Sequence, residues 1–127
     1  MTLTSAARVA GHGVTLNTIL MTCEVDIPTG VSVDVLLFDT SPTNSTFTDN
    51  ATLAVNVADI PFLVGCVSLS ERFDLGTPAA LIARNVGIQL APTASTTLYA
   101  VAVVRGAATL NLAATTDVRF AFGFLQD

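Results

Sequence analysis

The chain has 127 residues, of which 51% are hydrophobic and only 12% are charged, and its net charge is −5. This length suits one domain with a real core, and this apolar content excludes an intrinsically disordered chain. Lysine is absent and the five arginines are scattered, so the chain lacks the basic stripe that a nucleic-acid partner requires. The same shortage of cations argues against an anionic membrane, and no run of about 18 apolar residues predicts a membrane-spanning helix.

The apolar content also bears on how the domain is used. A domain of this size has a large surface for its volume, so part of its apolar area must lie outside or against partners. We therefore expect either an oligomer or a protein that is docked on something larger than itself.

The first predicted element is a strand over residues 19–27. Apolar and polar residues alternate there with a period of two, which is typical of a strand with one wet face. Its apolar members are Ile19, Met21, Cys23, Val25 and Ile27. Val14 and Leu16 fall on the opposite parity, so the slip near 17–18 predicts a bulge or a change of sheet. The residues before this strand leave open a flexible N-terminal arm over 1–12.

Residues 31–38 predict the second strand, after a Pro-Thr-Gly turn. One of its faces is apolar throughout. On the other face Ser32 and Asp34 give way to Leu36 and Phe38. The strand is therefore expected to enter from solvent and to end buried on both sides.

The middle of the chain predicts further short elements. Alternation over 53–57 indicates a strand, and the stretch 58–64 favours a short helical turn because Pro61 is tolerated near a helix start. Residues 65–70 then predict a strand, and 78–91 predict one or two more.

The last two predicted strands are the most apolar. Residues 97–106 indicate a central strand that is apolar on both faces, and 118–126 indicate a closing strand with a core-facing row of large side chains. That row is Val118, Phe120, Phe122 and Phe124. About eight short strands divided by Gly, Pro, Asn and Thr turns predict an all-β antiparallel β-sandwich, most economically a jelly roll, forming a single domain over 1–127. An immunoglobulin-like sandwich has less support, because Trp and a paired-Cys frame are lacking.

The two cysteines indicate packing rather than chemistry. Cys23 and Cys66 each stand among apolar neighbours, as small buried hydrophobes do. Free, buried thiols are the favoured state, and a Cys23–Cys66 bridge stays open because sequence gives no Cα separation. Two cysteines without companion histidines make no zinc site.

The sequence predicts no catalytic residues and no cofactor, so the chain is not expected to be an enzyme. His12 is the sole histidine and lies between two glycines in an expected exposed loop, and no nucleophile elbow is present. Glu24, Asp26 and Asp34 occupy solvent-facing strand positions, where a solvated face is the ordinary role of a carboxylate.

The polar loop after residue 38 is the remaining candidate site. Asp39, Asn44, Asp49 and Asn50 could offer oxygens to Ca²⁺, but their spacing does not match the tight alternation of recognisable calcium loops. Turn formation and Asx-type bonds to the loop's own backbone explain these residues better. We expect a structural, metal-free loop. Asn44 and Asn50 also match the glycosylation sequon, which has meaning only in a secretory context.

The same loop carries a family resemblance. The segment DVLLFDTSPTNSTFTDNATLAV at 34–55 resembles a pattern found in small proteins encoded among the head genes of tailed bacteriophages. The later segment TTLYAVAVVRGAAT at 96–109 and the closing FGFLQD are similar to the family's final strands. The match covers roughly residues 30–60 and 96–127.

This resemblance implies a capsid cement, or decoration, protein. Such proteins are all-β and commonly trimeric, and they brace neighbouring major capsid proteins on the outer surface of the virion after synthesis in the host cytoplasm. The family carries no catalytic residues, so none is transferred. The alternative is a β-sandwich module that binds carbohydrate or a receptor on a virion or cell surface. Tyr99 is the only Tyr and Trp is absent, which counts against a sugar platform.

Overall fold

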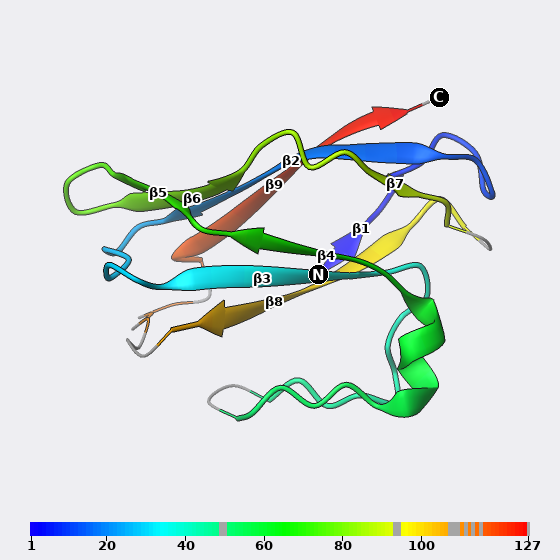
Figure 1. Cartoon of the computed structure of the whole chain (residues 1–127), viewed down its shortest axis with the longest axis horizontal. Coiled ribbons are helices and arrows are strands. Elements are labelled where there is room, and N and C mark those ends of the chain that lie inside the picture. The colour runs from blue at the N-terminus through cyan, green and yellow to red at the C-terminus, as the bar shows by residue number, and fades with distance from the viewer. Residues whose placement is uncertain are drawn as a thin grey trace.

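Two antiparallel sheets face each other across an apolar core in the computed structural model, which describes residues 1–48, 51–92, 95–106, 110, 112, 114 and 116–126 (Figure 1). Sheet A has the strand order β1-β8-β3-β4, and sheet B has the order β5-β6-β2-β7 with β9 on the other flank of β2. The bounds are β1 Thr2–Leu3, β2 Val14–Cys23, β3 Ser32–Phe38, η1 Val57–Phe62, β4 Leu63–Leu69, β5 Glu71–Asp74, β6 Ala79–Ala83, β7 Ile88–Leu90, β8 Leu98–Arg105 and β9 Val118–Gln126. The predicted all-β antiparallel sandwich is confirmed.

Within each sheet, a strand from the first part of the chain pairs with a strand from the last part. β2 pairs with β9, and β3 pairs with β8, so an early and a late strand lie side by side in each sheet. A jelly roll shares this arrangement. On their other flanks β2 meets β6 and β7, while β3 meets β4.

The predicted phase slip in β2 is a bulge. The register with β9 shifts between Leu16 and Thr18, so that Leu16 and Ile19 both face the core and both are fully buried. β7 pairs with the residues before the bulge and β6 with those after it. Gly123 lies opposite the bulge, where an added Cβ would collide with the hydroxyl of Thr18, so a larger residue here would have to displace that hydroxyl.

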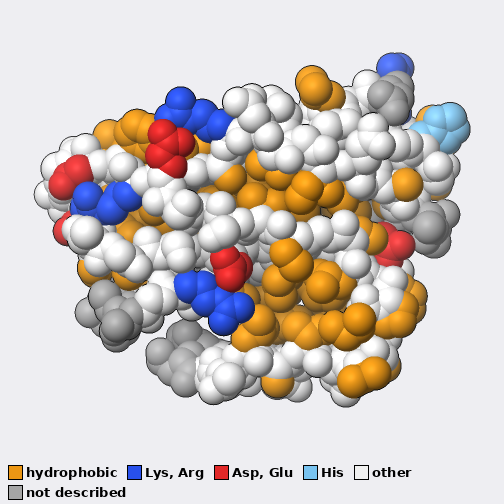
Figure 2. Space-filling view, in the orientation of Figure 1, with side chains coloured by type: hydrophobic (Ala, Val, Ile, Leu, Met, Phe, Trp, Pro, Cys, Tyr) orange, Lys and Arg blue, Asp and Glu red, His pale blue; other side chains and the backbone are white. Residues whose placement is uncertain are grey.

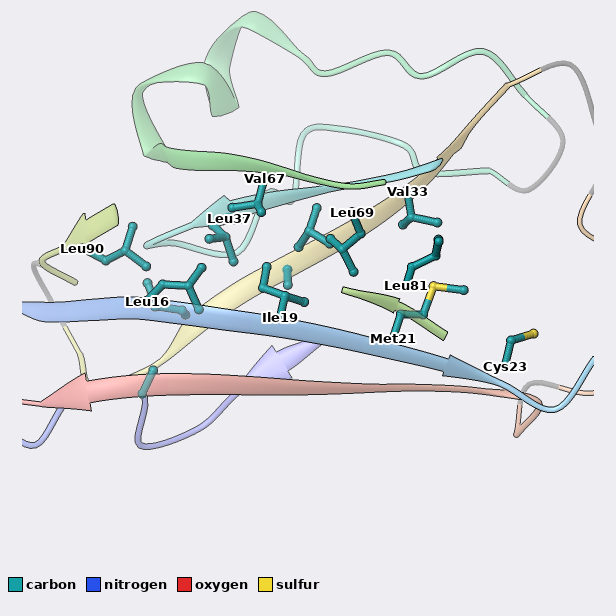
Figure 3. Close-up of a cluster of buried hydrophobic side chains, with 14 of the residues drawn as sticks. Leu16, Ile19, Met21, Cys23, Val33, Leu37, Val67, Leu69, Leu81 and Leu90 are labelled. Atoms are coloured by element: carbon teal, nitrogen blue, oxygen red, sulfur yellow. The ribbon is translucent and has the colours of Figure 1, made fainter. Parts of the chain in front are cut away.

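The core lies between the sheets, as the alternation predicted. Figure 3 shows Leu37, Val67 and Leu69 of sheet A directed toward Ile19 and Met21 of sheet B. The end of β3 is buried on both sides, because Leu36 and Phe38 on its outer face are 7% and 0% exposed.

Two predicted elements differ from the structure, and one observed strand of sheet B was not predicted. Residues 53–57 form no strand, because the segment lies outside both sheets and runs into η1, whose first turn is capped by Asn56. The expected helical turn is this 3₁₀ helix. Strand β8 is central only over its first residues, and β5 was not predicted because its sequence Glu-Arg-Phe-Asp is mostly charged.

The N-terminal residues, for which the sequence left a flexible arm open, lie against the domain. β1 pairs with β8, Ala6 and Ala7 are buried, and the Ala7 amide donates to the carbonyl of Thr96 at 3.2 Å. The side chain of Gln126 donates to the carbonyls of Ser5 and Ala6, which fastens the end of β9 to this segment.

Candidate interaction surface

Residues 39–62, which we call the excursion, join β3 to β4 on the side of sheet A that faces away from the core (Figures 1 and 3). Its base is closed where the Asp39 amide donates to the carbonyl of Phe62 at 3.0 Å. Phe38 is fully buried beneath it. The excursion therefore covers the end of β3, and η1 forms its last part before the chain enters β4.

Asp59 holds the two arms of this excursion together. It is 1% exposed, and its Oδ2 accepts from the Ser45 hydroxyl at 2.6 Å and from the Asn44 amide at 3.1 Å. Its Oδ1 accepts from Nδ2 of Asn44 at 2.9 Å. The Ser45 oxygen in turn accepts from the backbone amide of Asn56 at 2.9 Å. Each polar group of this buried carboxylate thus has a partner, as a buried charge requires.

These contacts set the protonation state of Asp59. Burial by itself would raise the pKa of the carboxyl, but the hydrogen bonds from the Ser45 and Asn44 side chains and amides outweigh it. The pKa therefore lies below its ordinary value, and the group stays ionised at neutral pH. A charged acceptor makes stronger hydrogen bonds than a neutral one, so the excursion is firmly anchored.

The outward side of η1 is apolar. We call Val57, Ile60 and Phe62 the η1 ridge, and they are 84%, 49% and 36% exposed. Figure 2 shows hydrophobic side chains gathered over β4 and η1. Asn56 caps the helix by accepting from the Ala58 amide at 2.9 Å. The ridge is an exposed apolar surface on a segment that capping and the buried Asp59 hold in place.

The exposed thiol lies on β4, the strand that follows η1, and corrects one expectation. Cys66 is exposed, not buried, because it points to the outer face of β4, the edge strand of sheet A; Cys23 is buried, and both cysteines are free. Partial desolvation and, next, the Asp34 carboxylate raise the pKa of the Cys66 thiol. A raised pKa lowers the thiolate fraction at neutral pH, so Cys66 is not an activated nucleophile.

The charged side chains are arranged as ion pairs rather than as a site. Arg72 contacts Asp26 at 2.7 Å, Arg84 contacts Glu71 at 2.6 Å, Arg105 contacts Asp34 at 2.8 Å and Arg119 contacts Glu24 at 3.5 Å. Glu24, Asp26 and Asp34, the three candidate carboxylates, therefore each lie against a different arginine. The structure does not bring them together as a catalytic pair.

The remaining candidates are dispersed. His12 is exposed in the N-terminal loop, as expected. Asp49 and Asn50 lie outside the described residues. Among the residues that the structure describes, no group of three His, Cys, Asp or Glu side chains could hold a metal ion. In the same part of the chain, no helix is long and apolar enough to cross a membrane.

Sequence reasoning singled out Asn44 and preferred a structural role for it over metal binding, but it missed the partner, Asp59. The amide of Asn44, a candidate metal ligand, donates instead to the Asp59 carboxylate. The sequence signal for this part of the excursion is Asn56, because asparagine is a typical helix cap and its side chain accepts from the Ala58 amide. Nothing in the sequence ties Ser45 to Asp59, which is 14 residues further along the chain.

Comparisons with known proteins add no identity to this geometry. No protein family, curated protein or solved structure matches the chain. The class that the structure defines is therefore an all-β sandwich with an anchored, apolar surface projection.

Proposed function

We propose that this chain is a structural virion protein that binds the outer surface of a phage capsid and cements neighbouring major capsid proteins. The single observation that carries the proposal is the η1 ridge, where three apolar side chains are exposed on a segment fixed by the buried Asp59. The resemblance of residues 34–55 to capsid cement proteins falls on the excursion that carries this ridge.

Anchoring of the ridge favours binding over simple exposure. Binding orders side chains and loops, and that cost is reduced where the bound conformation exists beforehand. Interfaces draw most of their energy from a few large apolar or aromatic anchors that lose water completely. Val57, Ile60 and Phe62 fit this role because they project from the sheet while their backbone is held by caps and hydrogen bonds.

Charge supports a position outside the shell. The chain has a net charge of −5, and four of its five arginines are already paired with acids. Such a surface is repelled by packaged DNA and suits the outer face, where only protein is contacted. The partner that this surface fits is an uncharged, apolar patch of the major capsid protein.

A homotrimer belongs to the same proposal. It rests on the family resemblance, and the apolar composition supports it. A closed ring covers apolar side chains and strand edges together, and each stable contact would bury on the order of 800 Å² per partner. Light scattering of the purified protein tests this part separately.

The test is binding to capsids that lack the protein. Wild-type protein should attach to them and raise the temperature at which they rupture, whereas Val57→Asp combined with Ile60→Asp should abolish both effects. Leu75→Asp is the matched control, because Leu75 is 61% exposed on the distant β5–β6 turn. A wild-type protein that ignores such capsids would remove the proposal. Binding to a glycan or receptor would then support the binding-module alternative.

A further inference from the structure

Strand β8 is only partly covered on the flank that faces away from β3. β1 pairs with Leu98 and Tyr99, and Met1 exchanges two hydrogen bonds with Ala100, at 2.7 and 2.9 Å. Beyond Ala100, no described strand pairs with this flank, although β8 continues to Arg105. Among the residues that the structure describes, the second half of β8 therefore has no strand paired to this flank, and we call it the bare edge.

The alternation of an antiparallel ladder shows which groups the edge presents. A residue directs its N–H and C=O to the same flank, and the next residue directs them to the opposite flank. Since both groups of Ala100 bond to Met1, those of Ala102 and Val104 point to the same open flank. The N–H and C=O groups of Val101 and Val103 point to β3. The bare edge thus offers two donors and two acceptors in strand spacing.

The side chains at this edge are also uncovered. Ala102 and Val104 lie opposite Val35 and Val33, which face the core, so they too point between the sheets. Both are nevertheless exposed, and Val104 is 46% exposed. Beside them an open groove of about 440 Å³ is lined by Met1, Phe47, Ala100, Val101, Ala102, Val118 and Phe120.

The charges at the groove select its occupant. Every side chain that lines it is uncharged, and the charge that the lining residues carry is the N-terminal ammonium of Met1, which donates to the carbonyl of Ala100. Arg105, the last residue of β8, is paired with Asp34, and Arg119 of β9 is paired with Glu24, so each of these four charged groups already lies against an opposite charge. A basic segment would lose hydration here and meet the like charge of the Met1 ammonium, and an acidic segment would find only that ammonium, which already donates to Ala100. An uncharged segment loses less hydration, so it fits the groove best.

We propose that this groove and the β8 edge bind an extended, uncharged segment of a partner protein as an added strand. The segment runs antiparallel to β8 in the line of β1 and bonds to Ala102 and Val104. Its alternate side chains are small or apolar and fill the groove against Val118 and Phe120. β1 already makes the same contact one step earlier along β8, and strand addition of this kind is a general mode of peptide recognition. The inference goes beyond the proposed function and does not require it.

Amide hydrogen exchange of the wild-type protein tests the edge directly. In the free protein the amides of Ala102 and Val104 should exchange at least tenfold faster than those of Val101 and Val103, which are internal controls on the same strand. The probe is a capped peptide of alternating threonine and valine. Adding it should slow exchange at Ala102 and Val104, while a copy with N-methylated amides should have no effect.

A variant pair removes one donor without touching the β3 ladder. Ala102→Pro deletes an N–H that points to the open flank, and proline is tolerated on a strand edge of this kind. It should weaken binding of the threonine–valine peptide at least tenfold, while Ala102→Ser, which keeps the N–H, should bind as the wild type does. Circular dichroism checks that both variants fold.

Three results would overturn the inference. One is equal protection of all four amides in the free protein, which would mean that the edge is already paired. Another is equal peptide binding to wild type and Ala102→Pro. The third is protection of Ala102 and Val104 that rises with protein concentration, together with dimers in light scattering, because a second copy would then occupy the edge.

Discussion

The two long sides of the sandwich differ in how the sheets meet. On one side, the β4 seam, β4 lies against β6 and β7, and a Cβ on Gly65 would stand only 3.5 Å from Ile88 and 3.6 Å from Leu90. On the other, the β8 seam, inward-pointing Ala102 and Val104 are exposed beside an open groove. Apolar alternation is present on both sides, so the pattern of side chains does not explain the difference.

Chain connection explains it better. Ser70 is the single residue between β4 and β5, so the chain crosses from sheet A to sheet B there and holds the two edges together. β8 and β9 are adjoining strands in the chain too, but residues 106–117 separate them. A short crossing forces two sheet edges together, and a long one leaves their separation to packing. The open seam is the side at which a partner strand has room.

The largest loss of stability is expected from a substitution at the closed β4 seam. Leu69 of β4 is fully buried, so Leu69→Ala should cost about 2–5 kcal/mol of unfolding free energy, the usual range for a buried leucine. Val104→Ala on the open side should change it by no more than about 0.5 kcal/mol, because half of that side chain is already in water. Urea unfolding of the two variants measures the difference. Equal losses would mean that the β8 seam is as closed as the β4 seam.

Phe122 should give an intermediate effect. It packs on the core in register with Ile19 and stacks on Phe124, with ring centroids 6.3 Å apart, but β9 is an edge strand and the ring is only partly buried. Phe122→Ala should therefore cost about 2 kcal/mol, less than Leu69→Ala. Urea unfolding checks the order, and a loss near zero would show that the phenylalanine row faces solvent.

Asp59 tests the stability of the excursion independently of the two seams. Its folded-state pKa is lowered, so the stability it contributes is present above the ordinary carboxyl pKa and is lost as pH falls through the lower folded value. The wild type should lose stability below about pH 4, and Asp59→Asn should be less stable at pH 7 and less sensitive to acid. Thermal melts from pH 7 to 3 measure this. Parallel curves for the two proteins would show that Asp59 does not anchor the excursion.

Alternation predicted the interior of this fold well, and it failed at the edges. The positions of Ile19, Met21 and the bulge before Thr18 follow from local parity, because burial on one face imposes a period of two. Alternation at 53–57 did not produce a strand, since nothing in a local pattern says whether a neighbouring strand is available to pair with it.

The exposure of Cys66 and the hydrogen bonds of Asp59 could not be predicted from the sequence for the same reason. Cys66 has apolar neighbours along the chain, but it points away from the core because of its register with Leu36. The Asp59 network joins residues far apart in sequence, and the open edge at Ala102 depends on where β1 ends. These features follow from which strands become neighbours, and that is decided by the whole topology.

Cys66 should give the smallest effect and the finest test of the closed seam. It belongs to β4, as Leu69 does, but its side chain points outward and is exposed. If the seam is closed by inward side chains alone, Cys66→Ser should change the unfolding free energy by no more than about 0.5 kcal/mol. In the native protein an alkylating agent should modify Cys66 and spare the buried Cys23. The rate should increase toward alkaline pH as the reactive thiolate forms, and this increase should occur at higher pH than for a free thiol because the pKa of the Cys66 thiol is raised. Mass spectrometry counts the modified sites. Rapid modification of both cysteines without denaturant would mean that the sheets separate readily, and the contrast between the two seams would then not hold in solution.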